Sequence, residues 1–388
     1  MLKAAAIAFL ATMLASSGAH AGKIGSPFVV DLGFLGDDGC DSDSVASLQN
    51  YGFVVVYVCD IDFSDSIKGR IFDLNGNNPV SILNLDIDPW SGDPPSVGSS
   101  ASGRFVVAWD QFGKDVGYDV IAKRFRPNGV RFAREARVNT TRPGDQVQPS
   151  VAMLNDSGYV VVWRSHPAKG PDGIFGRLYD VNGKPLGNDF QVNTQPALYA
   201  DAPSVAALST GGFVVAWNSG AQLYNAKGKR VAGEFKFNTQ VANHQIKPRV
   251  TALENGAFEI VWVLPGQGIY GQRYNRLGRA VGNEIQVVAG SDLDFPAIAG
   301  LIDGRFVVTW TNAAVNAGAG GVFGQIYNVR GNPAGSAFEV DTPDFQLSAT
   351  YPSHIAGLST GGFVVTWSDN STANGSNNGE VRAQLFGP

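Results

Sequence analysis

The stretch Pro203-Ser-Val-Ala-Ala-Leu-Ser-Thr-Gly-Gly-Phe-Val-Val-Ala-Trp217 decides the fold, because its last five residues recur in seven copies along the chain. Each copy is an aromatic residue, three mostly β-branched residues and a second aromatic residue. The copies open at Phe53, Phe105, Tyr159, Phe213, Phe258, Phe306 and Phe363 and close at Tyr57, Trp109, Trp163, Trp217, Trp262, Trp310 and Trp367. Their starts are 45 to 57 residues apart, a spacing typical of propellers and solenoids.

One repeat, from Pro203 to Thr239, divides into four segments separated by turn residues. We expect strands at Ser204–Leu208 and Phe213–Trp217, a third ending at Tyr224, and a fourth at Glu234–Asn238. The second segment is short, β-branched and bounded by glycine, which argues against a helix. It is also apolar at nearly every position, as expected of a strand that is covered on both faces. The repeat therefore predicts a four-stranded antiparallel blade.

The two ends of the chain predict that the blades close into a ring. The last copy stops at Phe386, the aromatic residue of its third strand, and lacks a fourth strand. Phe28–Asp31 matches the fourth-strand segment Phe338–Asp341, so a strand over 28–32 would complete the last blade and leave no exposed edge. We expect an all-β, seven-bladed β-propeller as a single domain over 22–388. Its blades start near residues 43, 95, 149, 203, 248, 296 and 352.

The first 21 residues predict a secretory signal, with Lys3, an apolar run from Ala4 to Leu14, and the small-residue site Ala19-His20-Ala21. No other apolar run approaches the roughly 20 residues that a membrane-spanning helix needs. We therefore expect an exported protein, periplasmic or extracellular, without a membrane span. The net charge of −5 and the scattered lysines and arginines argue against nucleic acid as a partner. The sequence does not indicate an oligomeric state.

The two cysteines, Cys40 and Cys59, lie on either side of the first hairpin turn of blade one. In an exported protein this placement predicts a disulfide bond. Carboxylates crowd the same part of the sequence. Because Ca²⁺ takes six to eight oxygen ligands, they are candidates for a calcium site, although the spacing matches a calcium loop only in part and a solvated acidic loop is the alternative. The candidates are Asp37, Asp41, Asp43, Asp60, Asp62 and Asp65. No other cofactor is expected.

No local motif indicates catalysis, since the sequence has no nucleophile elbow, zinc-protease helix or phosphate-binding glycine loop. The three histidines beyond the signal, His166, His244 and His354, belong to different blades and would form an acid–base or metal site only across the central channel. The alternative is ordinary loop and strand histidines. Aromatic residues outside the repeated phrase are candidates for stacking on a ligand. These are Trp90, Tyr118, Tyr199, Phe345 and Tyr351.

The connection between the second and third strands varies in length. From closing aromatic to third-strand aromatic it spans 15, 16, 16, 7, 12, 17 and 19 residues in blades one to seven. The short connections in blades four and five predict that the rim of the propeller is low there. The low rim is either an open entry toward the central channel or a neutral deletion in a tolerant loop.

The phrase Pro-Ser-Val-Ala-x-Leu-x-x-Gly-Gly-Phe-Val-Val-x-Trp, complete at 203–217 and nearly so at 149–163 and 352–367, resembles a repeat common in secreted and surface bacterial proteins. The resemblance covers essentially the whole mature chain and implies a propeller without an agreed activity. The calcium-binding loops of integrin-type repeats, the kelch pattern and the Asp-box of sialidases do not appear in the blades.

Three functional hypotheses remain open from the sequence. The first is an exported binding protein that recognises a glycan or a protein partner through the loop-rich face. The second is a carbohydrate-active enzyme, a polysaccharide lyase or glycosidase, with its site near the central channel. The third is a structural envelope protein. A fold alone does not choose among them, and the absence of a local catalytic motif leaves enzymatic activity open.

Overall fold

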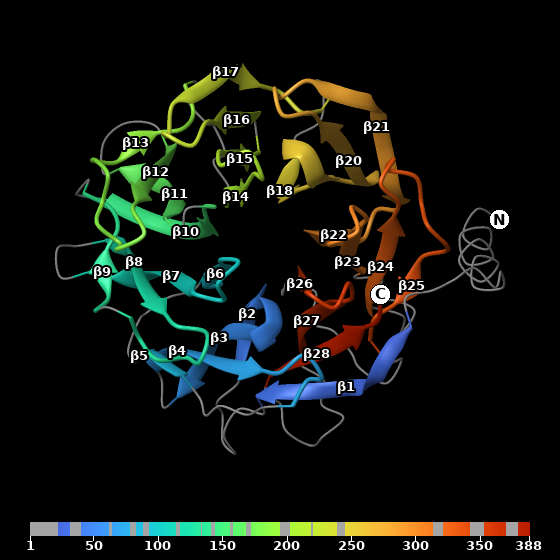
Figure 1. Cartoon of the computed structure of the whole chain (residues 1–388), viewed down its shortest axis with the longest axis horizontal. Helices are drawn as coiled ribbons and strands as arrows, with labels where there is room; N and C mark the ends of the chain where they lie inside the picture. The colour runs from blue at the N-terminus through green and yellow to red at the C-terminus, as the bar shows by residue number, and fades with distance from the viewer. Residues whose placement is uncertain are drawn as a thin grey trace.

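The computed structural model describes most of the chain in segments. These segments are residues 22–31, 40–61, 64–77, 83–87, 93–113, 117–132, 134–140, 144–155, 158–167, 172–194, 202–218, 220–238, 245–312, 321–341, 353–369 and 379–388. Seven four-stranded sheets are arranged as blades around a central axis (Figure 1). Every strand pairing in them is antiparallel, which confirms the predicted all-β propeller.

The strands of the first four blades follow one another along the chain from the axis outward. Blade 1 holds β2 (Cys40–Ser47), β3 (Phe53–Ile61), β4 (Ser64–Phe72) and β5 (Leu83–Ile87). Blade 2 holds β6 (Ser96–Ser99), β7 (Phe105–Phe112), β8 (Tyr118–Phe125) and β9 (Ala136–Arg137). Blade 3 holds β10 (Gly144–Met153), β11 (Tyr159–Pro167), β12 (Gly173–Tyr179) and β13 (Phe190–Gln191). Blade 4 holds β14 (Ser204–Ala207), β15 (Phe213–Trp217), β16 (Gly220–Tyr224) and β17 (Arg230–Phe235).

The remaining blades continue the same order. Blade 5 holds β18 (Ile246–Ala252), β19 (Phe258–Leu264), β20 (Gly268–Tyr274) and β21 (Ala280–Ala289). Blade 6 holds β22 (Leu293–Gly300), β23 (Phe306–Asn312), β24 (Gly321–Tyr327) and β25 (Phe338–Glu339). Blade 7 holds β26 (His354–Gly357), β27 (Phe363–Asp369), β28 (Glu380–Phe386) and the N-terminal β1 (Lys23–Asp31).

Helix is confined, in the described parts of the chain, to two single turns at η1 (Gln49–Tyr51) and η2 (Glu254–Gly256). Neither is long enough to cross a membrane, and the search of the described residues finds no other candidate span.

The fourth strand differs most from the expectation. It is two residues long in blades 2, 3 and 6, and in blade 4 it begins at Arg230 rather than Glu234. In blades 3 and 6 the first residues after the turn are Pro185 and Pro333, which form only isolated bridges to the third strand. Arg131 of blade 2 occupies the same position and also forms only an isolated bridge, so the short fourth strand does not depend on proline, whereas Arg230 of blade 4 begins a continuous strand.

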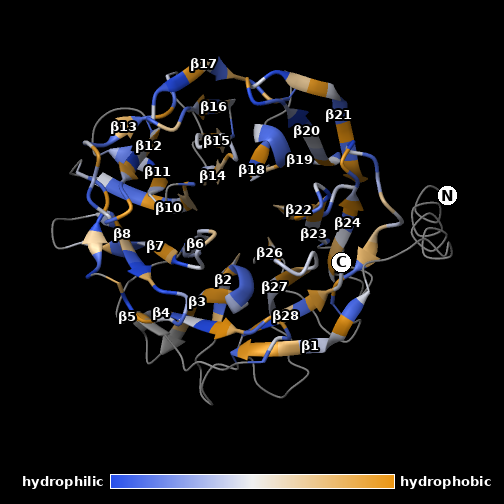
Figure 2. Cartoon of the chain, in the orientation of Figure 1, coloured by the Kyte–Doolittle hydropathy of each residue, from blue (hydrophilic) through white to orange (hydrophobic). Residues whose placement is uncertain are grey.

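The repeated aromatic phrase forms the core of every blade. Its opening residue stacks on the aromatic residue that ends the third strand, with centroids 4.5 to 5.2 Å apart in all seven blades. The closing Trp or Tyr side chains are 0 to 4% exposed, so they are packing residues. Because successive side chains of a strand point to opposite faces, each second strand contacts both neighbouring blades; Phe213, Val215 and Trp217, for example, pack with Val160 and Val162 of blade 3. Figure 2 shows hydrophobic and hydrophilic residues mixed in the blades around the whole ring.

The serine of the Pro-Ser-Val-Ala phrase links inner strands of neighbouring blades. Ser96 Oγ accepts a hydrogen bond from the backbone N–H of Val151 at 3.1 Å. Ser150 accepts one from Val205 at 3.2 Å, and Ser204 one from Val250 at 3.1 Å. The phrase therefore encodes contact between blades as well as the blade itself.

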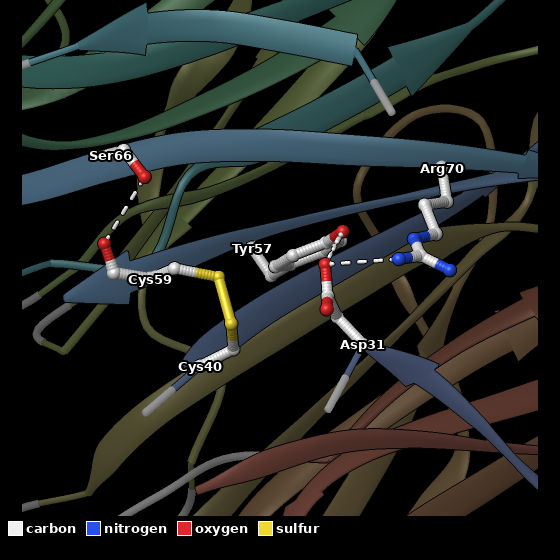
Figure 3. The surroundings of a disulfide bond; sticks show 6 residues. All are labelled: Asp31, Cys40, Tyr57, Cys59, Ser66 and Arg70. Carbon is white, nitrogen blue, oxygen red and sulfur yellow. Dashed lines mark hydrogen bonds and ion pairs between the residues drawn. A yellow bond between two sulfur atoms is a disulfide. The ribbon is translucent and has the colours of Figure 1, made fainter. Parts of the chain in front are cut away.

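The ring closes as the sequence predicts, with β1 lying alongside β28 in the last blade (Figure 1). The seam is tied across to blade 1, since the Tyr57 hydroxyl donates to Asp31 Oδ2 at 2.6 Å and Arg70 lies 3.4 Å from the same oxygen (Figure 3). Cys40 and Cys59 are direct partners across β2 and β3, with Cα atoms 4.0 Å apart, and form the predicted disulfide. Tyr57 takes the place of the usual tryptophan where the ring closes, and its hydroxyl supplies the hydrogen bond.

Candidate functional site

The two ends of the strands define two faces of the ring. The connections from second to third strand and from each blade to the next leave on one face, which we call the loop face. The hairpin turns between first and second and between third and fourth strands form the turn face. On the loop face, Trp217 pairs directly with Gly220 in blade 4 and Leu264 with Gly268 in blade 5. The short connections expected there are present, and an open entry beside them stays a prediction.

An exposed aromatic pair marks the loop face of blade 2. Phe112 ends β7 and is 56% exposed, and Tyr118 begins β8 opposite it. Their rings meet edge to face, with centroids 5.4 Å apart and planes at 78°. The pair combines the exposed Phe112 ring with the partly buried phenol of Tyr118, a combination suited to a ligand with both apolar and polar surfaces.

Two carboxylates, from blades 2 and 3, lie next to the backbone of Tyr118. The Tyr118 backbone N–H donates to Asp145 Oδ1 at 3.1 Å across the blade boundary. Asp119 accepts a hydrogen bond from Asn139 Nδ2 at 2.7 Å and lies 3.5 Å from the Arg137 guanidinium. These contacts hold both carboxylates in place beside the aromatic pair, with Asp145 partly exposed.

His166 extends the same surface into blade 3. Asp145 and His166 are direct partners across β10 and β11, so their side chains share one face of the sheet. Asp172 contacts His166 Nδ1 and also accepts a hydrogen bond from Arg164 at 2.7 Å. Burial alone would raise the pKa of Asp172, but hydrogen bonds from Arg164 and His166 outweigh it and hold that pKa below its usual range. We call Phe112, Tyr118, Asp119, Asp145, His166 and Asp172 the blade 2–3 cluster.

A second polar group lies at the seam between blades 7 and 1. Asp43 of β2 is fully buried and accepts a hydrogen bond from the Thr366 hydroxyl of β27. His354 Nδ1 lies 3.6 Å from the same carboxylate oxygen, and the His354 side chain is 20% exposed. His354 pairs with Thr366 as Ser204 pairs with Ala216, so it occupies the serine position of the repeat. We call Asp43, His354 and Thr366 the blade 7–1 triad.

The last blade carries a buried ion-pair network near the triad. Arg382 of β28 lies 2.9 Å from both Asp369 and Glu380. Asp369 and Glu380 are direct partners across β27 and β28, so a single guanidinium forms ion pairs with two adjacent carboxylates. This network gives the seam a charged interior that the other described blades lack in this form.

The structure separates the two described histidines. His166 lies on β11 of blade 3 and His354 on β26 of blade 7, on different sides of the ring (Figure 1). Each contacts an aspartate of its own neighbourhood rather than the other histidine. His244 lies outside the described residues, as do the stacking candidates Trp90, Tyr199, Phe345 and Tyr351.

The calcium candidates are described only in part. Asp43 belongs to the blade 7–1 triad, Asp41 is partly buried in β2, and Asp60 and Asp65 are backbone partners at the tip of the β3–β4 hairpin. Asp37 and Asp62 lie outside the described residues. Within the described part of the chain, one group of three potential metal ligands is close together, Asp31 with Cys40 and Cys59. Its cysteines are bonded to each other, so the calcium site stays a prediction.

Several residues of the loop face were not anticipated. The sequence did not single out Phe112, although it lies three residues after Trp109, the closing residue of the repeat phrase. The sequence also did not single out a group on the inner strands of blades 5 and 6, formed by Lys247, Asp294 and Phe295. Lys247 Nζ lies 2.6 Å from Asp294 and 3.5 Å from the centroid of the Phe295 ring. Lys247 and Phe295 have left-handed φ angles of 52° and 46° and lie at bulges in the inner strands. The proline that follows each of them is the signal that could have revealed a bulge.

No protein-family model matches the sequence, and no match to a curated protein is found. Among solved structures, a protein of unknown function from Dyadobacter fermentans has a TM-score of 0.56 at 9% identity, over 94% of this chain and 98% of the other. A fungal alcohol oxidase in complex with copper has a TM-score of 0.55 at 11% identity, over 95% and 77%. An α-L-arabinofuranosidase from Fusarium graminearum has a TM-score of 0.52 at 10% identity, over 93% and 98%. At such identities the similarity establishes the propeller fold, which this chain shares with proteins of different activities.

Proposed function

We propose that the protein is an exported propeller that binds glycans on its loop face, with the blade 2–3 cluster as the recognition site. The exposed edge-to-face pair of Phe112 and Tyr118 beside fixed carboxylates carries the proposal. A sugar ring has an apolar C–H face and a polar rim of hydroxyls. The aromatic pair offers the stacking surface, while Asp119, Asp145 and Asp172 offer acceptors for hydroxyl hydrogens.

Export is the second element of the proposal. The Cys40–Cys59 disulfide is typical of a protein in an oxidising compartment. The secretory signal predicted over the first 21 residues supports export as well. We place the protein in the periplasm or outside the cell, where surface and matrix glycans are the abundant polymers.

A carbohydrate-active enzyme is the second candidate, and the blade 7–1 triad is the observation that favours it. A buried carboxylate in contact with an imidazole and a hydroxyl is a grouping that acid–base chemistry uses. A structural neighbour with the same fold is an arabinofuranosidase. Glycosidases act with two carboxylates facing across the scissile bond, whereas Asp43 faces His354 and Thr366. Binding therefore has the stronger support.

A glycan array with the purified protein tests the proposal. We expect binding to at least one glycan class. Phe112→Ala and Tyr118→Ala should each weaken it about ten- to a hundredfold, because burying one aromatic ring against a ligand contributes roughly 1.5–3 kcal/mol. Leu186→Ala is the matched control, since Leu186 is 65% exposed on the turn face and should leave binding unchanged.

The same glycans are incubated with the protein and followed for released products. Release that is abolished by His354→Gln but retained by Phe112→Ala would assign the function to the triad and reject binding as the primary role. Absence of both binding and release across glycan classes would reject both hypotheses and leave the structural envelope protein. Loss of binding in the Leu186→Ala control would show that the effect is not specific to the cluster.

A further inference from the structure

Blade 2 also carries an unusual group of cations, at the ends of its strands that lie on the turn face. The guanidinium carbons of Arg104 and Arg124 each lie 5.0 Å from the centroid of the Phe132 ring, and that of Arg126 lies 5.9 Å from it. Phe132 is 36% exposed. Arg131 precedes it in the chain and is exposed as well. We call Arg104, Arg124, Arg126, Arg131 and Phe132 the arginine patch.

The fold holds this patch in place. The Phe132 backbone N–H donates to the Arg124 carbonyl at 2.7 Å, which fixes the ring against the end of β8. Arg104 comes from the turn that precedes β7, and Arg124 and Arg126 flank the end of β8. Stacking of guanidinium groups on an aromatic face is favourable, so the ring gathers three like charges that would otherwise repel one another.

Other cations of the third strands bind backbone carbonyls and carboxylates of the described residues, whereas the arginine patch makes few such contacts. Lys123 Nζ donates to the Leu85 carbonyl at 2.7 Å and lies 3.2 Å from Glu135. Arg177 donates to the Val138 carbonyl at 2.7 Å. For the arginine patch, the described residues supply no carboxylate partner. Its one polar side-chain contact among them is a 3.4 Å hydrogen bond from Arg124 to the Val181 carbonyl.

The chemistry of this surface indicates an anionic ligand. Guanidinium groups bind carboxylate and sulfate through paired hydrogen bonds. The chain as a whole has a net charge of −5, so the patch is a local concentration of positive charge and not part of a basic protein. Arg126, Arg131 and Phe132 are all exposed, which suits an extended polymer that contacts several arginines at once.

We infer that the arginine patch is a second binding site, for an anionic polysaccharide that carries carboxylate or sulfate groups. The patch lies at the opposite end of β7 and β8 from Phe112 and Tyr118, so the site is separate from the blade 2–3 cluster. It goes beyond the proposed function in both location and ligand charge.

The test measures retention of the full-length mature protein on immobilised polygalacturonate and on immobilised heparin, with dextran as the neutral surface. We expect retention on at least one anionic polymer at low salt, declining as NaCl screens the charges. Arg104→Gln/Arg126→Gln should weaken affinity roughly fivefold, because each solvent-exposed charge pair contributes only modestly to binding. The control is Arg276→Gln/Arg330→Gln, which removes the same charge from exposed positions in the equivalent turns of blades 5 and 6.

The outcomes separate this inference from the proposed glycan site. Retention that Arg104→Gln/Arg126→Gln weakens is assigned to the arginine patch, and retention that Phe112→Ala weakens is assigned to the blade 2–3 cluster, so failure of one site does not imply failure of the other. The inference is overturned if neither polymer retains the protein, or if both double variants lose affinity equally. It is also overturned if vesicles of phosphatidylglycerol bind while both polysaccharides do not. Should the patch double variant unfold at a lower temperature than wild type, the single exposed variant Arg126→Gln gives the deciding comparison.

Discussion

The residue that follows the valine just after the fourth strand is asparagine in blades 2 and 3 and aspartate in blade 6, and this difference introduces a buried charge. Asn193 Oδ1 accepts a hydrogen bond from the Ile174 N–H of the third strand at 2.8 Å, and Asn139 does the same for Val120 at 2.9 Å. In blade 6 the residue is Asp341, whose Oδ1 accepts from Val322 at 3.1 Å. The carboxylate makes the same bond but brings a charge into a buried site. Burial, with a contribution from Glu339, raises the pKa of Asp341 to about 7.

We predict that Asp341→Asn stabilises the protein above pH 7. The pKa of Asp341 is raised in the folded state, so the folded protein binds more protons than the unfolded chain between about pH 4 and pH 7. Its contribution to stability is therefore present at low pH and lost as the pH rises through 7. Asparagine keeps the hydrogen bond without the charge, and we expect a gain of about 1–3 kcal/mol at pH 8 that shrinks toward pH 5. Urea unfolding at pH 5 and pH 8 measures it.

Asn193→Asp is the reciprocal control in blade 3. It should be destabilising at pH 8 and nearly neutral at pH 5. Equal stability of wild type and Asp341→Asn at every pH would show that burial of the Asp341 carboxylate does not destabilise the folded protein.

At the scale of elements, the β2–β3 hairpin is the most constrained part of blade 1. The disulfide joins residues 19 apart in sequence, and the hydroxyl of Ser66 donates to the Cys59 carbonyl at 3.2 Å. This hairpin contains Tyr57, which contacts the closing strand, and Asp43, which contacts blade 7. Stability of the hairpin and of the seam are therefore coupled.

We predict that Cys40→Ala/Cys59→Ala lowers the free energy of unfolding by roughly 3 kcal/mol, because closing a loop of this length restricts the unfolded chain by about that amount. Denaturant unfolding of the double variant measures the loss. Wild type treated with a reducing agent should show a similar loss; full stability in both samples would mean that the bond does not constrain the unfolded chain.

At the scale of the whole molecule, one strand decides whether the ring is closed. β1 provides the outer strand of blade 7, and Asp31 at its end reaches Tyr57 and Arg70 of blade 1. Without it, β28 would expose an unpaired edge, which is a template for pairing with other chains. Closure also places the strand ends of all blades on two faces, where the blade 2–3 cluster and the arginine patch lie on opposite sides.

We predict that deletion of residues 27–33 produces a protein that aggregates or unfolds at a much lower temperature than the same chain lacking only residues 1–21. Size-exclusion chromatography and thermal unfolding of the two truncations provide the measurement. A monomeric product with an unchanged unfolding temperature would contradict the closure of the ring by this strand.

Much of the fold could be predicted because the repeat encodes it locally. The phrase of Phe213–Trp217 predicts a strand covered on both faces, and its tryptophan is indeed buried. The cysteines also follow from local order, since a short hairpin brings Cys40 and Cys59 together. The candidate site was predicted far less completely: Tyr118 and His166 were named from the sequence, but nothing in it joined them through Asp145.

The sequence by itself determined the blade and the number of copies, because strand periodicity, turn glycines and buried aromatics act between residues near one another in the chain. It also indicated the strand that closes the ring, because the last copy lacks a fourth strand and Phe28–Asp31 matches one. Only the tertiary structure decided which polar groups meet. Asp43 and Thr366 are separated by 323 positions in the sequence. Arg104 does not stand out among the other lysines and arginines of the sequence, and it reaches Phe132 only when β7 and β8 pair. Arg104 and Phe132 meet through strand pairing within blade 2, whereas Asp43 and Thr366 belong to the first and last blades and meet only when the ring has closed.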